Sequence, residues 1–169
     1  MPISGFFLLA AASAAVCFDL GGGRIPNLLN LYVLITGFAF QFLKSGVPGL
    51  CASAAGTVLP FLLLYPFFRF RMLGGGDIKL LMAFGAVVGY PEILNILLAS
   101  FLAGGILSFF VLLFITGFRP RFRYFRNYFL NNMNGQQRIS YRKSGKCAEN
   151  IHFSVPILAC TVLYAGGLI

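Results

Sequence analysis

Two aspartates, Asp19 and Asp77, are the residues of this chain whose type and setting could do chemistry. They are the only aspartates among the 169 residues, and each lies where an apolar run meets glycines, Gly21–Gly23 or Gly74–Gly76. Two carboxyl groups held close together share one proton. The ionised group can then take a proton from a water molecule, while the protonated group supports the oxyanion that forms. Such a pair could hydrolyse a peptide bond without a metal ion, a cofactor or a nucleophilic side chain.

The composition predicts that a membrane scaffold holds these two groups. Hydrophobic residues make up 59% of the chain and charged residues only 10%, whereas soluble domains average about 25% charged residues. Because one membrane span needs roughly 20 apolar residues, the chain has room for about six. We therefore expect an all-α polytopic helical bundle, with residues 1–169 forming a single membrane domain and no room for a separate soluble one.

The breaks between apolar runs predict where each helix lies. The first run has no Lys or Arg before it, as a secretory signal would need, so we expect a permanent helix broken by Gly21–Gly23. The fourth run is too short to cross a hydrocarbon core of about 30 Å, so we expect other helices to shelter it. The six expected helices span Pro2 to Phe18, Leu28 to Leu43, Pro48 to Phe68, Ile78 to Tyr90, Ile93 to Gly117 and Ile151 to Ile169.

The basic residues predict how the chain is oriented in the membrane, and they do not indicate that it binds nucleic acid. The net charge is +9, but the basic residues lie between apolar runs, where membrane topology demands them. With six spans and both termini outside, twelve of the thirteen lie on the cytoplasmic side, eight of them in a loop at about 118–150, and only Lys44 falls outside. This topology puts Asp19 and Asp77 at the same membrane face.

Several of these residues also allow a purely structural interpretation. Each aspartate could be a solvated charge at a helix end, and Asp77 could be a helix N-cap. The glycines before Asp77 could let a substrate approach the backbone, or could simply form a turn. Lys79 could tune the pair electrostatically or lie at the membrane interface with its charge in water. The four cysteines form no C-x-x-C pair, so no zinc site is predicted.

Two motifs resemble those of the type IV prepilin peptidases. Gly74-Gly75-Gly76-Asp77-Ile78-Lys79 fits their G-x-G-D-hydrophobic-K signature, and Asp19 followed by Arg24-Ile25-Pro26-Asn27 is similar to their first catalytic aspartate and its R-I-P-N. The resemblance covers nearly the whole chain. His152 stands where that family's last segment has a proline, which affects the start of the last helix and not the pair.

The resemblance implies a bacterial inner-membrane endopeptidase with its active site at the cytoplasmic face. Asp19 and Asp77 would be catalytic, and Gly74, Gly75, Gly76 and Lys79 would belong to the active-site loop. The substrates would be prepilins or pseudopilins of a type IV pilus, a Flp/Tad pilus or a type II secretion system, cut after a glycine that ends a basic leader. Larger members carry paired C-x-x-C zinc motifs and N-methylate the product. Only Gly21–Pro26 separates the first two expected helices here, so methyltransferase activity is not expected.

Other interpretations remain open at this point. A G-x-G-D protease of the presenilin or signal-peptide-peptidase type is larger and has Tyr before its first aspartate, whereas Phe18 precedes Asp19 here. A preflagellin peptidase would differ mainly in substrate. Outside the enzymes, a small transporter or cation-binding membrane protein could use the same two carboxylates, and a non-catalytic assembly factor would not need them. The sequence predicts no particular oligomeric state.

Overall fold

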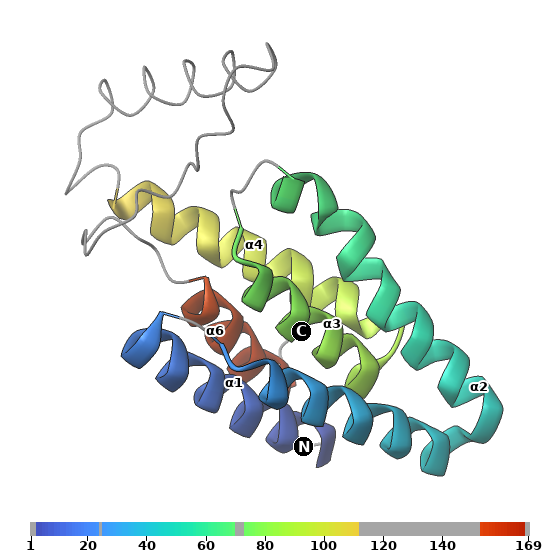
Figure 1. The fold of residues 1–169 in the computed structure, drawn as a ribbon. Helices are drawn as coiled ribbons and strands as arrows, with labels where there is room; N and C mark the ends of the chain where they lie inside the picture. Colours follow the sequence, from blue (N-terminus) through green and yellow to red (C-terminus); the bar gives the residue numbers. More distant parts are fainter. Residues whose placement is uncertain (1–2, 24, 70–72, 112–152, 168–169) are drawn as a thin grey trace.

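The computed structural model describes residues 3–23, 25–69, 73–111 and 153–167, and helices account for nearly all of them. The prediction of an all-α protein is confirmed for this part of the chain. Arg24, His152 and the basic loop expected at 118–150 lie outside it. The helices are α1 (Ile3–Gly22), α2 (Asn27–Arg69), α3 (Gly75–Val88), α4 (Glu92–Val111) and α6 (Ser154–Ala165), arranged as Figure 1 shows.

Helix α2 is bent into two limbs at Gly46. Its backbone there is non-helical, with φ 63° and ψ −138°, a left-handed φ that glycine adopts without steric cost. Unbent, its 43 residues would extend about 65 Å, roughly twice the thickness of a hydrocarbon core. The bend lies where the sequence predicts the boundary between its second and third helices, and Figure 1 shows the two limbs diverging from it.

Helix α3 is the central element, packed between the two limbs of α2. Glycines permit the close approach on both sides. A Cβ on Gly37 in the first limb would lie 2.8 Å from Val87 N, and one on Gly56 in the second limb would lie 2.4 Å from Gly85 O. Buried residues of α3 therefore include Leu80, Leu81, Ala83, Phe84 and Val87. The expectation that other helices shelter this short apolar segment is confirmed.

Hydrogen bonds between helices satisfy carbonyls at the end of α3. Gln41 Nε2 in the first limb donates to Val87 O at 3.1 Å and to Val88 O at 3.0 Å. Ser53 Oγ in the second limb donates to Ala86 O at 2.8 Å. The last carbonyls of a helix have no partner within that helix. These two polar side chains therefore remove the free-energy cost of burying unpaired carbonyls in an apolar interior.

The contacts place several helix ends at one end of the bundle. Asn27, at the start of α2, meets Lys79 near the start of α3, and Gly75 faces Phe68 at the close of α2. The end of α1 meets the start of α6 through Asp19 and Ser154. The bend of α2 and the last residues of α3 lie at the opposite end, because Gln41 contacts Val88. Both sequence motifs therefore lie at the same end of the molecule.

Two predicted helix boundaries were wrong, and both differences concern the aspartates. The first helix does not stop at Asp19: it continues through Gly21 and ends at Gly22, and Gly23 follows with a φ of 65°. The fourth begins at Gly75 rather than Ile78, with Gly74 as its N-cap. Glycine lowers helix propensity by about 1 kcal/mol but does not prevent a helix from forming. Both aspartates consequently lie within helical turns.

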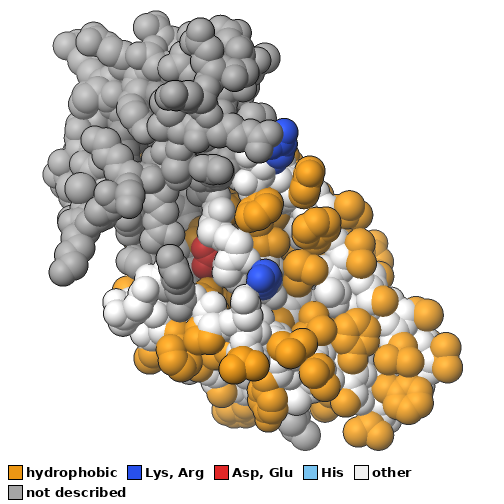
Figure 2. Space-filling model, viewed as in Figure 1, with side chains coloured by type: hydrophobic (Ala, Val, Ile, Leu, Met, Phe, Trp, Pro, Cys, Tyr) orange, Lys and Arg blue, Asp and Glu red, His pale blue; other side chains and the backbone are white. Residues whose placement is uncertain are grey.

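The described surface suits a membrane. Three helical stretches are long and apolar enough to cross one, namely Ser4–Gly22, Asn27–Arg69 and Glu92–Phe110. Large apolar side chains such as Leu28, Leu43 and Leu102 are 70% or more exposed, and Figure 2 shows apolar side chains over much of the visible face. The charged side chains visible in Figure 2 lie close to the residues drawn in grey. The chain is thus a polytopic membrane protein, and the count of six spans stays a prediction.

Candidate active site

Asp19 lies in the last turn of α1 and is buried, with 7% of its surface exposed. Its carboxylate faces the start of α6, where Ser154 Oγ donates a hydrogen bond to Asp19 Oδ2 at 2.6 Å. The turn itself is closed by Gly23 N, which donates to Asp19 O at 2.8 Å. The sequence predicted the aspartate as a candidate but gave no indication of this serine partner, 135 positions away.

Asp77 lies in the first turn of α3 and is partly buried. A carboxylate at this position complements the partial positive charge at a helix N-terminus. It is not the N-cap itself, which is Gly74. The side chain folds back over that residue, because a Cβ on Gly74 would lie 2.9 Å from Asp77 Oδ2. A side chain at the first glycine of the motif would therefore displace the carboxylate.

Two contacts bring the motif that follows Asp19 against the motif that contains Asp77. Lys79 Nζ donates to Asn27 Oδ1 at 3.0 Å. One turn earlier in α3, Gly76 packs against Ile25, since a Cβ on Gly76 would lie 3.4 Å from Ile25 Cβ. Helix α1 also contacts α3 directly. Four residues of the two motifs thus form one continuous contact at the same end of the bundle.

The middle glycine of the motif faces the end of α2. A Cβ on Gly75 would lie 3.4 Å from Phe68 Cε2, which is a tight contact with the tip of a side chain. The three glycines therefore have different neighbours: the Asp77 carboxylate for Gly74, an aromatic ring for Gly75 and Ile25 for Gly76. Added bulk would disturb the carboxylate most directly at Gly74.

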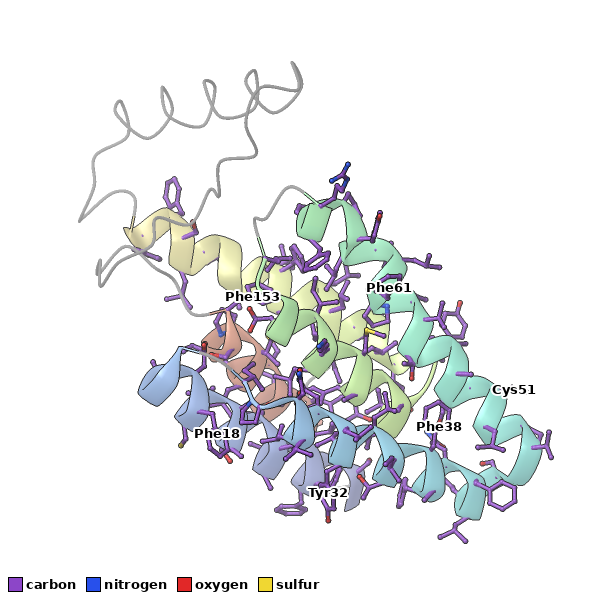
Figure 3. The ribbon with its side chains drawn as sticks, in the orientation of Figure 1. Phe18, Tyr32, Phe38, Cys51, Phe61 and Phe153 are labelled. Carbon is purple, nitrogen blue, oxygen red and sulfur yellow. The ribbon has the colours of Figure 1, made fainter. Side chains whose placement is uncertain are left out.

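A row of three aromatic rings fixes the beginning of α6. The rings of Phe67 and Phe101 have centroids 5.5 Å apart, and the ring of Phe153 meets Phe101 edge-on at 5.4 Å. Gly104 makes room for this arrangement, because a Cβ there would lie 2.8 Å from Phe153 Cε2. Figure 3 shows Phe153 at the start of α6, whereas Tyr32 and Cys51 project outward from α2. The residue next to Phe153 is Ser154, which contacts Asp19.

Asn30, like Ser154, is a buried polar residue that the sequence pattern did not indicate. It is 5% exposed, and neither Oδ1 nor Nδ2 has a hydrogen-bond partner among the described residues. It lies on the face of α2 that also carries the buried residues Val33, Gly37 and Gln41. A polar residue on the apolar face of a membrane helix is itself a signal of function and could have identified this position.

Neither the cysteines nor the acidic residues of the described part form a metal-binding cluster. No group of three or more His, Cys, Asp or Glu side chains comes together there. Cys17 and Cys51 are exposed free thiols, and Cys160 is a buried one.

Comparison with known proteins gives one match. The model of the type IV leader peptidase family matches residues 6–109, a range that includes both aspartates, the glycines before Asp77, Asn27 and Lys79. No curated protein and no solved structure matches the chain.

Proposed function

This chain belongs to the type IV leader peptidase family, and we propose that it removes the basic leader from prepilin-like precursors with Asp19 and Asp77 as its catalytic pair. The family makes it an aspartic-type prepilin peptidase of the membrane. Residues 1–169 would form one peptidase domain whose two motifs act together. The precursor would be a class III signal peptide of a pilin or pseudopilin, cut at the cytoplasmic face of the bacterial inner membrane.

The observation that carries the proposal is the contact between the two motifs. The hydrogen bond from Lys79 to Asn27 and the packing of Gly76 on Ile25 join segments that lie more than 45 residues apart. Gly76 and Lys79 lie within two residues of Asp77, whereas Ile25 and Asn27 follow Asp19 by six and eight residues. A pair of carboxyl groups needs such a junction, because a water molecule must contact both of them at hydrogen-bond distance.

The reaction proposed for the pair needs one proton shared between two carboxyl groups. The ionised carboxylate takes a proton from a water molecule held between them, and the water oxygen attacks the carbonyl carbon of the scissile peptide bond. The protonated carboxyl group donates a hydrogen bond to the oxyanion that develops. Proton transfer to the amide nitrogen then lets the carbon–nitrogen bond break.

Glycine at the cut position and an apolar segment after it suit the surroundings of the pair. The glycines at 74–76 leave backbone accessible near Asp77, and residues without a Cβ allow a peptide to approach closely. The lipid-facing surface offers a path for the apolar segment of a membrane-embedded precursor. The placement of the reaction at the cytoplasmic face follows from the positive-inside distribution of the basic residues.

The test is cleavage of a defined precursor by the purified protein in detergent or lipid. The precursor carries a basic leader, a glycine at the cut position and an apolar helix after it, and mass spectrometry identifies the products. We expect a single cut after the glycine. A matched precursor with leucine in place of that glycine should not be cut. Cutting of both precursors at the same rate, or no cutting of any member of a pilin and pseudopilin panel, would contradict the proposal.

A further inference from the structure

We propose that Ser154 is a positioning residue that holds the Asp19 carboxylate in the orientation its reaction requires. This inference rests on the proposed function of the Asp19 and Asp77 pair. It adds a third side chain to the site, contributed by the last helix, which lies outside the range that the family model matches.

The contact is short and shielded from water. Ser154 Oγ lies 2.6 Å from Asp19 Oδ2, Ser154 is 1% exposed and Asp19 is 7% exposed. Hydrogen bonds to a charged group are stronger than those between neutral groups, and a surrounding of low polarity strengthens them further. A carboxylate held through one of its oxygens cannot rotate freely about its terminal torsion. Its two oxygens therefore occupy defined and different positions.

Ser154 donates to a carboxylate on another helix, as few hydroxyls in the described bundle do. Ser53 donates to Ala86 O on α3, and Tyr164 donates to Glu92 Oε2 on α4. Five other hydroxyls donate to a carbonyl three or four residues earlier in their own helix, namely those of Ser13, Thr36, Thr57, Ser100 and Thr161. Such bonds are local and need no partner helix. Ser154 instead donates to a side chain on α1. The bond thus depends on how α6 and α1 are placed relative to each other.

The surroundings of Ser154 keep that placement fixed. Its neighbour Phe153 is held by the ring of Phe101 and by the backbone of α4 at Gly104. Phe101 in turn contacts Phe67 near the end of α2. The start of α6 is therefore held against α4, which itself contacts α2 through Phe101, and Ser154 extends from it to Asp19. A reactive group held by a rigid second layer of contacts is the arrangement that catalysis favours.

The first test measures steady-state kinetics of precursor cleavage for Ser154→Ala, Ser154→Thr and Thr161→Val. Removal of the hydroxyl should lower kcat by about 10-fold or more, because a reacting group that loses its orientation costs up to about 100-fold, while KM changes less than about 2-fold. Ser154→Thr keeps a hydroxyl and should recover most of kcat. Thr161→Val, on the same helix, removes a bond to Leu158 O and should leave both constants unchanged.

The second test does not depend on activity. Because the chain has only two aspartates, protein made with aspartate 13C-labelled at the side-chain carboxyl carbon gives two carboxyl NMR signals. The Asp77→Asn variant, labelled in the same way, identifies the signal of Asp19. We expect Ser154→Ala to shift that signal and to leave the signal of Asp77 nearly in place. Thr161→Val should shift neither.

The two tests separate this inference from the proposed function. If wild-type protein cuts the precursor and Ser154→Ala cuts it with an unchanged kcat, Ser154 does not position Asp19. An unmoved Asp19 signal in Ser154→Ala would overturn the inference in the same way. If wild-type protein cuts no precursor, the proposed function fails, while a shifted Asp19 signal would still establish the contact between Ser154 and Asp19.

Discussion

Lys79 Nζ donates a hydrogen bond to Asn27 Oδ1 at 3.0 Å, and this bond joins the two sequence motifs of the chain. Asn27 is the first residue of α2 and the last residue of the motif that begins at Asp19. Lys79 is on the first turns of α3, two residues beyond Asp77. The pair lies at the surface, so its charge does not face a large desolvation cost. The hydrogen bond therefore links the two segments that carry the carboxylates.

We expect Asn27→Ala and Lys79→Met to lower kcat/KM by similar amounts, each about 3- to 10-fold, because one hydrogen bond is worth roughly 0.5–1.5 kcal/mol. The double variant should be little worse than either single variant, since both remove the same bond. Cleavage rates of the four proteins give the coupling directly. If Lys79 acts only as an interface residue with its charge in water, the losses will add and the coupling will be zero.

Gly74→Ala should lower cleavage far more than Gly75→Ala. A Cβ at position 74 would lie 2.9 Å from Asp77 Oδ2, whereas one at position 75 would lie 3.4 Å from the tip of the Phe68 ring. The backbone of Gly74 has φ −70°, so alanine is not strained there and displacement of the carboxylate is the expected effect. We predict a loss of about 10- to 100-fold in kcat for Gly74→Ala. Equal activities of the two variants would show that Asp77 does not need this space.

Gly85→Ala should unfold the protein at a markedly lower temperature. A Cβ on Gly85 would lie 1.9 Å from Gly56 O, and backbone cannot move aside as a flexible side chain can. Overpacking of this kind costs about 1–3 kcal/mol or more. Gly105→Ala is the matched control, because nothing lies within 4 Å of a Cβ at that helical position. Thermal unfolding in detergent compares the two, and a Gly85→Ala variant as stable as Gly105→Ala would contradict the close packing of α2 on α3.

Gln41→Leu should destabilise the bundle without touching the candidate site. The substitution leaves the carbonyls of Val87 and Val88 without the donor that Gln41 Nε2 provides. An unsatisfied buried carbonyl costs about 1–3 kcal/mol, although interhelical hydrogen bonds measured in membrane proteins average nearer 0.6 kcal/mol. Thermal unfolding should show the loss, with Thr36→Val as control because Thr36 bonds only carbonyls of its own helix. An unchanged unfolding temperature would mean that these carbonyls find another partner.

The sequence predicted some helix boundaries and missed others. The boundary at Lys44–Gly46 is confirmed as the bend of α2 at Gly46, because a positive φ there is a local property of one residue. The extension of α1 past Asp19 to Gly22 could not be predicted in this way. Glycine permits a helix as well as a break, and the contact of Asp19 with Ser154 on α6 cannot be read from the local sequence.

The sequence indicated the charged residues of the candidate site and the glycines before Asp77. Asp19 and Asp77 were indicated by their rarity and their position at the ends of apolar runs. The side chains that hold them were not, since Ser154 lies 135 positions from Asp19, and serine is common in helices for local reasons. The role of Gly74 likewise depends on a contact with Asp77 that no spacing rule contains. A single sequence gives little indication of the tertiary contacts that its small residues make.

The central claim, that Asp19 and Asp77 together cut the precursor, is tested most directly by cleavage with Asp19→Asn, Asp77→Asn and Glu92→Gln. Asparagine keeps the shape of aspartate but cannot exchange the proton that the reaction requires. We expect each aspartate variant to lose at least about 1,000-fold in kcat while its unfolding temperature stays near that of the wild type. Glu92→Gln, at the start of α4, should cut normally. If either aspartate variant cuts the precursor at the wild-type rate, the paired-carboxylate mechanism is wrong.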